Sequence, residues 1–179
     1  MVMKNFASTL LMSGSVFAGA SASICLNALS LILTERMQIM RDVAAYKAKY
    51  GLPVEDLARE EKVLSAARNT AQEAGLEPQS VESFISALMT AGKTIQYRYL
   101  ADGFAPADLS VTQRDLEGIR QRINELDKHL LMTISQRLRT GQLSYSERAW
   151  LAERTASPNL TVAEKDNLLD TMRYIQRAG

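Results

Sequence analysis

LSLILTERMQIMRDVAAYKAKY, residues 29–50, is the stretch of sequence that decides the predicted fold. Its apolar side chains recur at alternating steps of four and three residues, which is the spacing of one face of an α-helix. Two cations, Arg36 and Lys47, fall on that same face. They are eleven residues apart, so on a helix they point within about 20° of each other. The complete line of inward-facing positions is Leu29, Leu33, Arg36, Met40, Val43, Lys47 and Tyr50.

These two cations need compensation if they are buried among apolar neighbours. An uncompensated buried charge costs roughly several kcal/mol, so each cation requires an internal carboxylate or a bound anion. The alternative is that both side chains extend along the edge of the helix and keep their charges in water. A single lysine would fit that alternative, but Arg36 and Lys47 on one line favour a pocket for an anion.

Outward from this stretch, glycines and prolines divide the chain into further helical segments. No segment alternates between apolar and polar residues as a strand does. The length of 179 residues, with 46% hydrophobic and 23% charged residues, is typical of one globular domain. The sequence therefore predicts an all-α, single-domain bundle of about six helices, at residues 25–50, 54–74, 80–101, 111–139, 144–155 and 162–177.

The N-terminal segment has a different composition from the rest. Lys4 precedes a mildly apolar run at residues 6–18, and small residues follow that run. This order is typical of a secretory signal peptide that is cleaved after a small residue. We expect residues 1–22 to be removed by cleavage after Ala22, with cleavage after Ala20 as the second candidate.

Removal of the signal peptide leaves one helical domain, residues 23–179, in the periplasm or secreted. Its motif-bearing helices lie in residues 23–104 and its supporting helices in residues 105–179. We expect no stable membrane anchor after processing. A retained anchor is the alternative, since residues 24–33 are also apolar, but helical amphipathicity explains that stretch better.

Net charge and cysteine content limit the partners of the protein. Lys and Arg total 21 and Asp and Glu total 20, so no bulk charge favours nucleic acid as a partner. Any anion site must therefore be local. Cys25 is the only cysteine of the sequence, which leaves a buried thiol, or a disulfide between two chains, as the alternatives.

The second helix carries polar residues at its start. Asp56, Glu60, Val63 and Ala67 lie on one stripe that changes from polar to apolar, so its polar end can face a cavity. Acidic residues in a first turn are also typical of simple helix-dipole stabilisation. Arg59 lies just off the stripe.

The third and fourth helices add three more candidates. Gly92 and Gln96 lie on the flank of an apolar face, and a glycine inside a helix costs about 1 kcal/mol relative to alanine. Gly92 therefore makes room either for a ligand or for a close helix crossing. Arg120 lies between Leu116 and Ile123 on an apolar stripe, where it either reaches the same cavity or is a solvated flank residue.

Reactive groups of other kinds form no pattern in the sequence. We identify no metal-ligand spacing, catalytic triad or glycine-rich phosphate loop. The prediction is a cationic pocket with hydrogen-bonding groups, which requires neither a metal nor another cofactor.

This order of residues resembles a known family. The matching segments are Glu35-Arg36, Val43-Ala44-Ala45-Tyr46-Lys47, Leu52-Pro53-Val54-Glu55-Asp56, Arg59-Glu60 and Ile95-Gln96. The sequence resembles the all-helical, type II chorismate mutases over roughly residues 30 to 138. Its signal segment and its extra C-terminal helices resemble the secreted gamma-type subclass.

The resemblance implies an isomerase that rearranges chorismate to prephenate, without a cofactor and commonly as a homodimer. It implies that three arginines bind the carboxylates of the substrate and that two donors hold its ether oxygen, while two acidic residues organise its hydroxyl group. Gly92 departs from the small hydroxyl residue often found in the family. The three arginines are Arg36, Arg59 and Arg120. The two donors are Lys47 and Gln96, and the two acidic residues are Asp56 and Glu60.

Two other functions remain open at this point. One is a non-catalytic exported helical module that binds a partner helix or an anionic metabolite. The other is a degenerate mutase that binds its ligand without turnover.

Overall fold

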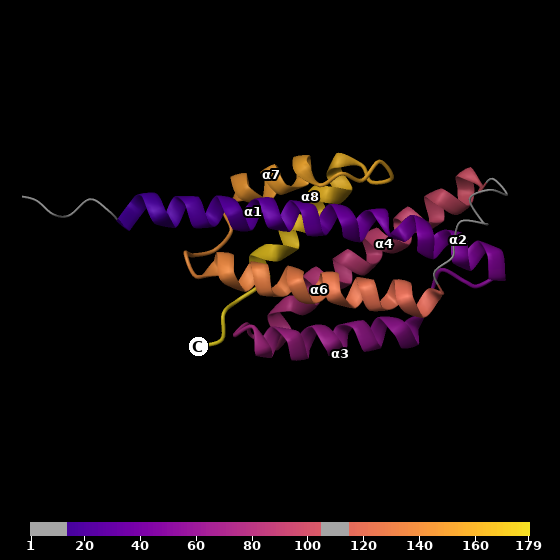
Figure 1. Cartoon of the computed structure of the whole chain (residues 1–179), viewed down its shortest axis with the longest axis horizontal. Coiled ribbons are helices and arrows are strands. Elements are labelled where there is room, and N and C mark those ends of the chain that lie inside the picture. Colours follow the sequence, from indigo (N-terminus) through magenta and orange to yellow (C-terminus); the bar gives the residue numbers. More distant parts are fainter. Residues whose placement is uncertain (1–13, 105–114) are drawn as a thin grey trace, which may run out of the picture.

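The structure is a computed structural model that describes residues 14–104 and 115–179, with side chains from residue 22 onward. Within these residues the protein is all-helical, which confirms the predicted fold class. Two 3-10 turns, Pro78–Val81 and Thr171–Tyr174, accompany the α-helices. The α-helices are α1 (Gly14–Gln38), α2 (Met40–Tyr50), α3 (Leu57–Glu73), α4 (Glu82–Asp102), α6 (Leu116–Leu138), α7 (Tyr145–Arg154) and α8 (Val162–Asp170) (Figure 1).

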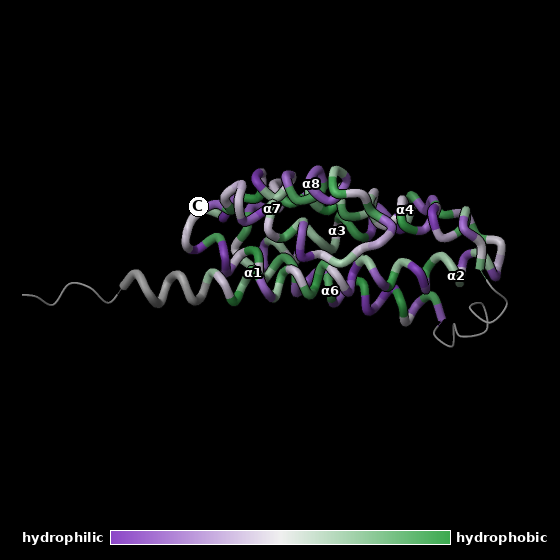
Figure 2. Tube along the Cα trace, turned by 90° about the horizontal axis from the view of Figure 1, so that it is seen from above, coloured by the Kyte–Doolittle hydropathy of each residue, from purple (hydrophilic) through white to green (hydrophobic). Residues whose placement is uncertain are grey.

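Helices α1, α3 and α6 lie lengthwise, and α4 crosses them obliquely (Figure 1). Helix α1 runs beside α6, and α3 lies along the other side of α6 (Figure 1). Seen from above, α1 and α6 form one layer, while α4, α7 and α8 lie in the other (Figure 2). Helix α4 therefore faces α1 and α2 across the core, α7 packs against α1, and α8 packs against α7 and α4.

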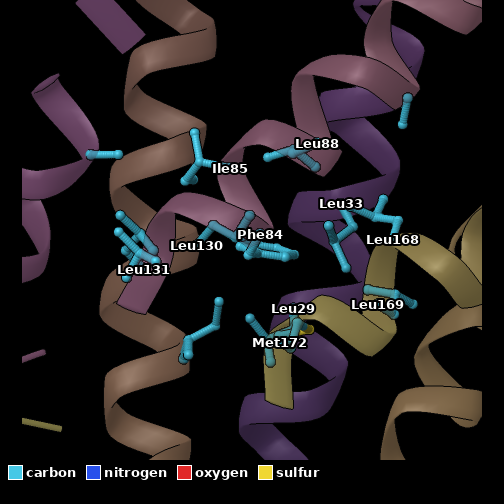
Figure 3. Packing of buried hydrophobic residues seen from close by; sticks show 14 of the residues in the cluster. Leu29, Leu33, Phe84, Ile85, Leu88, Leu130, Leu131, Leu168, Leu169 and Met172 are labelled. Carbon is cyan, nitrogen blue, oxygen red and sulfur yellow. The ribbon is translucent and has the colours of Figure 1, made fainter. Parts of the chain in front are cut away.

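The apolar core fills the middle of this bundle. Figure 3 shows Phe84 of α4 between Leu130 of α6 and Leu33 of α1, with Leu29 and Met172 close by. All five side chains are fully buried, and each such burial stabilises the fold by about 1.5–3 kcal/mol. The apolar stripes of α4 and α6 are also buried: Ile85, Leu88 and Ile95 on α4, and Ile119, Ile123, Leu126, Leu130, Ile134 and Leu138 on α6. Leu116, at the start of α6, is only partly buried.

Some predicted helix limits differ from the structure. The first predicted helix, residues 25–50, begins earlier, at Gly14, and is divided at Ile39. Ile39 keeps right-handed helical angles, φ −63° and ψ −16°, so α2 continues the direction of α1 (Figure 1). The prediction that Tyr50 faces inward is wrong. Tyr50 ends α2 and is 56% exposed, because the chain turns away at Gly51 in a left-handed conformation.

Two further helix limits also differ from the prediction. The predicted helix 111–139 is observed from Leu116 to Leu138, and residues 111–114 lie outside the described residues. The last predicted helix, 162–177, is too long, since α8 ends at Asp170 and is followed by a 3-10 turn.

Cys25 is buried and free, which favours a buried thiol over a disulfide between chains. Within the described ranges, no helix combines the length and the hydropathy that crossing a membrane requires.

One ion pair joins α4 to the start of α8. Arg98 Nη1 and Nη2 donate to the two carboxylate oxygens of Glu164 at 2.7 and 2.8 Å. Glu164 also accepts from the backbone N–H of Thr161, in a capping box. The hydrogen bond from Arg98, followed by the one from Thr161, lowers the pKa of Glu164 from 4.5 to about 2.

We predict that Glu164→Gln lowers the melting temperature at pH 7. A carboxyl group whose folded pKa is depressed stabilises the protein above its unfolded pKa, and that contribution disappears as the pH falls through the folded pKa. The difference in melting temperature should therefore shrink between about pH 4.5 and pH 2. Thermal unfolding followed by circular dichroism measures it, with the exposed Glu153→Gln as control. A difference that is absent at pH 7, or undiminished near pH 2, would contradict the assignment.

Candidate active site

An open cavity lies among α1, α2, α3, α4 and the first half of α6. The structure brings all eight residues selected from the sequence to the lining of this cavity. They are Arg36, Lys47, Asp56, Arg59, Glu60, Gly92, Gln96 and Arg120.

Arg36 enters the cavity from the last turn of α1. Its side chain is only 4% exposed, as the periodicity predicted. Its Nε donates to Oδ1 of Asp127, on α6, at 2.8 Å. Its Nη1 has only a weak contact of 3.6 Å with Sδ of Met40. The Nε side of the guanidinium is therefore held, while the Nη groups keep most of their capacity to donate.

Lys47 is buried without a carboxylate partner among its hydrogen bonds. It is 6% exposed, and its Nζ donates to the backbone carbonyl of Val54 at 2.7 Å. Burial is the main cause that lowers the pKa of Lys47 from 10.5. The charge of Asp56 raises that pKa, and the charge of Arg120 lowers it. An anion in the cavity would supply the compensation that the fold leaves incomplete.

Asp56 connects the start of α3 to α6. It is the N-cap of α3, where its Oδ1 accepts from the backbone N–H of Arg59 at 3.1 Å. Its Oδ2 accepts from Nη2 of Arg120 at 2.6 Å. Asp56 thus caps α3 and also lines the cavity.

Arg59 and Arg120 are neighbouring cations on two different helices. Nη2 of Arg59 donates to Oδ1 of Asn124 at 2.7 Å. Burial, followed by the like charge of Arg120, lowers the pKa of Arg59 from 12.5. The sequence left open whether Arg120 reaches the cavity, and in the structure it does. Two adjacent cations of this kind favour a ligand with negative charge.

Glu60 faces the cavity opposite Lys93 of α4. Nζ of Lys93 donates to Oε1 of Glu60 at 3.1 Å and to Oε2 of Glu55 at 2.9 Å. These bonds tie the start of α3 and the preceding loop to α4, so they fix one wall of the cavity.

Gln96 and Gly92 are buried, although the sequence placed them on the flank of α4. Nε2 of Gln96 donates to the carbonyl of Gly92 at 3.2 Å, and its Oε1 is buried without a partner. A Cβ atom at Gly92 would lie 3.0 Å from Sδ of Met40 and 3.7 Å from Nη1 of Arg36. Gly92 therefore permits the close approach of α1 and α2 to α4, and Met40 fills the space that a side chain at residue 92 would use.

Several residues that hold this site together were not predicted from the sequence. The most informative is Asp127, which is 7% exposed and lies seven residues after Arg120 on α6. A charged residue between Leu126 and Leu130, which continue the apolar stripe of Leu116 and Ile123, was the available signal. Lys93 and Asn124 carry no such signal, because their partners come from other helices. The missed residues are Met40 as a cavity contact, Val54, Lys93, Asn124 and Asp127.

The charges of the lining define the class of ligand. Five cationic side chains and two carboxylates face one cavity, so the site has a formal excess of positive charge. Guanidinium groups bind carboxylates through paired hydrogen bonds. The fold and the site together describe an all-helical protein with a cavity whose lining carries an excess of positive charge.

Comparison with known proteins identifies the family. Residues 27–97 match the family described as chorismate mutase type II. The monofunctional chorismate mutase of Enterobacter agglomerans is 49% identical over 172 residues, which cover 96% of this chain and 95% of that protein. The secreted chorismate mutase of Yersinia pestis is 32% identical over 146 residues, 81% of this chain and 78% of that protein. The chain belongs to the type II chorismate mutase family.

Solved structures agree with this assignment. The crystal structure of the secreted chorismate mutase from Yersinia pestis has a TM-score of 0.72 at 30% identity, and the match covers 83% of this chain and 97% of that chain. The chorismate mutase from Burkholderia phymatum has a TM-score of 0.68, with 87% and 98% coverage. At 23% identity, that second match bears on the fold alone.

We predict that Lys47 destabilises the unliganded protein. Burial lowers its folded pKa below 10.5, so between the folded pKa and 10.5 the unfolded chain binds more protons, and stability rises with pH. The stability of Lys47→Met relative to the wild type should therefore decrease as the pH approaches 10.5. Urea unfolding from pH 7 upward measures this change. Lys49→Met, an exposed neighbour on α2, is the control, and an equal pH trend in the two variants would contradict the prediction.

Proposed function

We propose that the protein is a chorismate mutase that rearranges chorismate to prephenate in this cavity. The observation that carries the proposal is the convergence of three arginines, a buried lysine and a buried glutamine on one small cavity. The 49% identity to a monofunctional chorismate mutase favours an enzyme over a non-catalytic helical module. The substrate, chorismate, carries two carboxylates and an ether oxygen, and the cavity offers donors for each.

The reaction needs positioning and charge stabilisation from the protein. In a single pericyclic step the ether C–O bond breaks while a C–C bond forms within the same molecule, and no proton is transferred. The flexible substrate must therefore be held in its compact reactive shape. Negative charge that grows on the ether oxygen must also be stabilised.

Arg36, Arg59 and Arg120 perform the first task in this proposal, by binding the two carboxylates. Each guanidinium has one side engaged by an acceptor of the protein, Asp127, Asn124 and Asp56 respectively. Side-chain entropy is lost before the substrate arrives, so less is lost on binding.

Lys47 and Gln96 perform the second task. Both are buried donors in the lining of the cavity, one on α2 and one on α4. Their present acceptors are backbone carbonyls. A hydrogen bond from either donor strengthens as the ether oxygen becomes negative, so it lowers the barrier rather than only tightening substrate binding.

Asp56 and Glu60 organise the hydroxyl group of the substrate and its surroundings. Both are held in place by cations, Arg120 and Lys93 respectively. Gly92 offers no side-chain donor, so its contribution is the space that Met40 and Arg36 occupy.

We also propose that the protein is exported, with residues 1–22 as its signal peptide and residues 23–179 as the mature domain. Similarity to a secreted chorismate mutase supports export. Among the described side chains, the first buried one is Cys25, so packing into the bundle begins just after the expected cleavage at Ala22. Dimer formation rests on the family resemblance alone and stays a prediction.

We predict that the purified protein removes chorismate, as followed by the loss of its absorbance, with prephenate as the product. Arg59→Ala removes a cationic donor from the cavity and should lower kcat/KM by about 100-fold or more. Arg139→Ala, an exposed arginine at the end of α6, should retain wild-type activity. A folded wild-type protein that leaves chorismate unchanged would refute the proposed function.

We predict a change in pH dependence for Gln96→Glu. An amide donates a hydrogen bond at every ordinary pH, whereas a carboxyl group donates only while it is protonated. The variant should therefore be most active at acidic pH and lose activity toward neutrality, while the wild type stays active. Profiles of kcat/KM against pH from 4 to 8 measure this. Superimposable profiles would remove Gln96 from the ether-oxygen role.

A further inference from the structure

Helix α6 presents a row of polar side chains to the site, at Arg120, Asn124 and Asp127. Their spacing of four and three residues places them on one face of the helix. Each contacts a different partner: Arg120 pairs with Asp56, Asn124 accepts from Arg59, and Asp127 accepts from Arg36. The face of α6 therefore touches three polar residues of the cavity, two of which are arginines from other helices.

We propose that Asp127 is a positioning residue that fixes the guanidinium of Arg36 for binding a carboxylate of the substrate. The inference rests on the proposed function and adds to it a residue outside the cavity lining. Asp127 itself does not touch the substrate.

The geometry of the pair supports this role. Oδ1 of Asp127 accepts from Nε of Arg36 at 2.8 Å, and both side chains are at least 90% buried. A bond at Nε sets the rotation of the planar guanidinium and leaves the Nη groups free of strong acceptors. The contact of Nη1 with Sδ of Met40, at 3.6 Å, is weak. A guanidinium that is held at its Nε keeps its two Nη groups available to a ligand in the cavity.

The second oxygen of Asp127 strengthens the argument. Oδ2 is buried and accepts no hydrogen bond, so Arg36 is the partner that the structure gives to this carboxylate. A buried carboxylate oxygen without a donor is costly. A buried ion pair is also weak evidence for stability, since apolar residues of similar volume often replace such a pair without loss. The pair is thus poorly explained as a tie between α1 and α6, and better explained by the orientation of Arg36.

The test uses the full-length protein and Asp127→Asn, which preserves shape but removes the charge that holds Arg36. Arg36 binds a carboxylate in both the substrate and the transition state, so its misplacement should raise KM by about tenfold and change kcat by less than about threefold. Glu125→Gln is the matched control, since it makes the same chemical change on an exposed residue of α6 that pairs with Arg122. It should leave KM within about twofold of the wild-type value.

A double-mutant cycle separates positioning from a merely structural effect. In an Arg36→Lys background, Asp127→Asn should change KM by less than about twofold, because the group it acts through is already altered. An unchanged KM in the single variant, or the same tenfold rise in the Arg36→Lys background, overturns the proposal. If Asp127→Asn does not fold, Asp127→Glu replaces it. That variant keeps the charge and displaces the carboxylate by one methylene, and a wild-type KM for it also overturns the proposal.

Calorimetric binding of prephenate distinguishes this inference from the proposed function. Prephenate carries the two carboxylates that Arg36 and its neighbours would bind, and its binding needs no turnover. Absence of turnover by the wild type refutes the mutase activity alone. Asp127→Asn should still weaken prephenate binding by about tenfold, that is by about 1.4 kcal/mol. Equal affinity in the variant and the wild type, or no binding to either protein, overturns the positioning role.

Discussion

Burial of Arg36 and Lys47 on the inward face of α1 and α2 is the constraint on which the rest of the structure depends. Charges that leave water lose several kcal/mol of hydration each, by rough estimate. Hydrogen bonds within the fold compensate only part of this loss. Arg36 donates to one carboxylate through Nε, and Lys47 donates to one backbone carbonyl. The residues that complete the site come from α3, α4 and α6, which meet around these two cations.

The inward face of α1 runs from the apolar core, which stabilises the molecule, to the cavity, where we place the function. Leu29 and Leu33 lie in the apolar core, packed with Phe84 (Figure 3). The next inward residue of α1 after Leu33 is Arg36, less than one turn further on. At this point the apolar core ends and the cavity begins. The core therefore stabilises a bundle in which the cavity end is electrostatically unfavourable without a ligand. Such a division is the usual form of the trade-off between stability and activity.

Periodicity was enough to predict the fold class and the burial of two cations at the candidate cavity. The inward direction of Arg36 and Lys47 follows from 3.6 residues per turn, and burial confirms it. The position of Tyr50 could not be predicted in this way, because the helix ends there and periodicity contains no information about where a bundle stops. The break at Ile39 is equally invisible, since its backbone angles remain helical.

Contacts between helices were harder to predict from the sequence than the helices themselves. The pairing of Arg36 with Asp127 spans 91 residues of sequence, and nothing in the local pattern of either helix selects the other. Asp127 was nevertheless detectable as a charge among core positions, by the same reasoning that selected Arg36. For Gly92, by contrast, the sequence could not decide between two structural alternatives. Its two alternatives, space for a ligand and close packing, differ only in the position of Met40, which is a tertiary property.

The crystal structure of the protein with a bicyclic dicarboxylate that mimics the transition state is the most direct test of the account. If the proposed function is correct, the carboxylates of this ligand contact Arg36, Arg59 and Arg120. Its ether oxygen then lies within hydrogen-bonding distance of Lys47 and Gln96. A ligand bound elsewhere, or bound in this cavity with Arg36 and Lys47 still lacking an anionic contact, would contradict it.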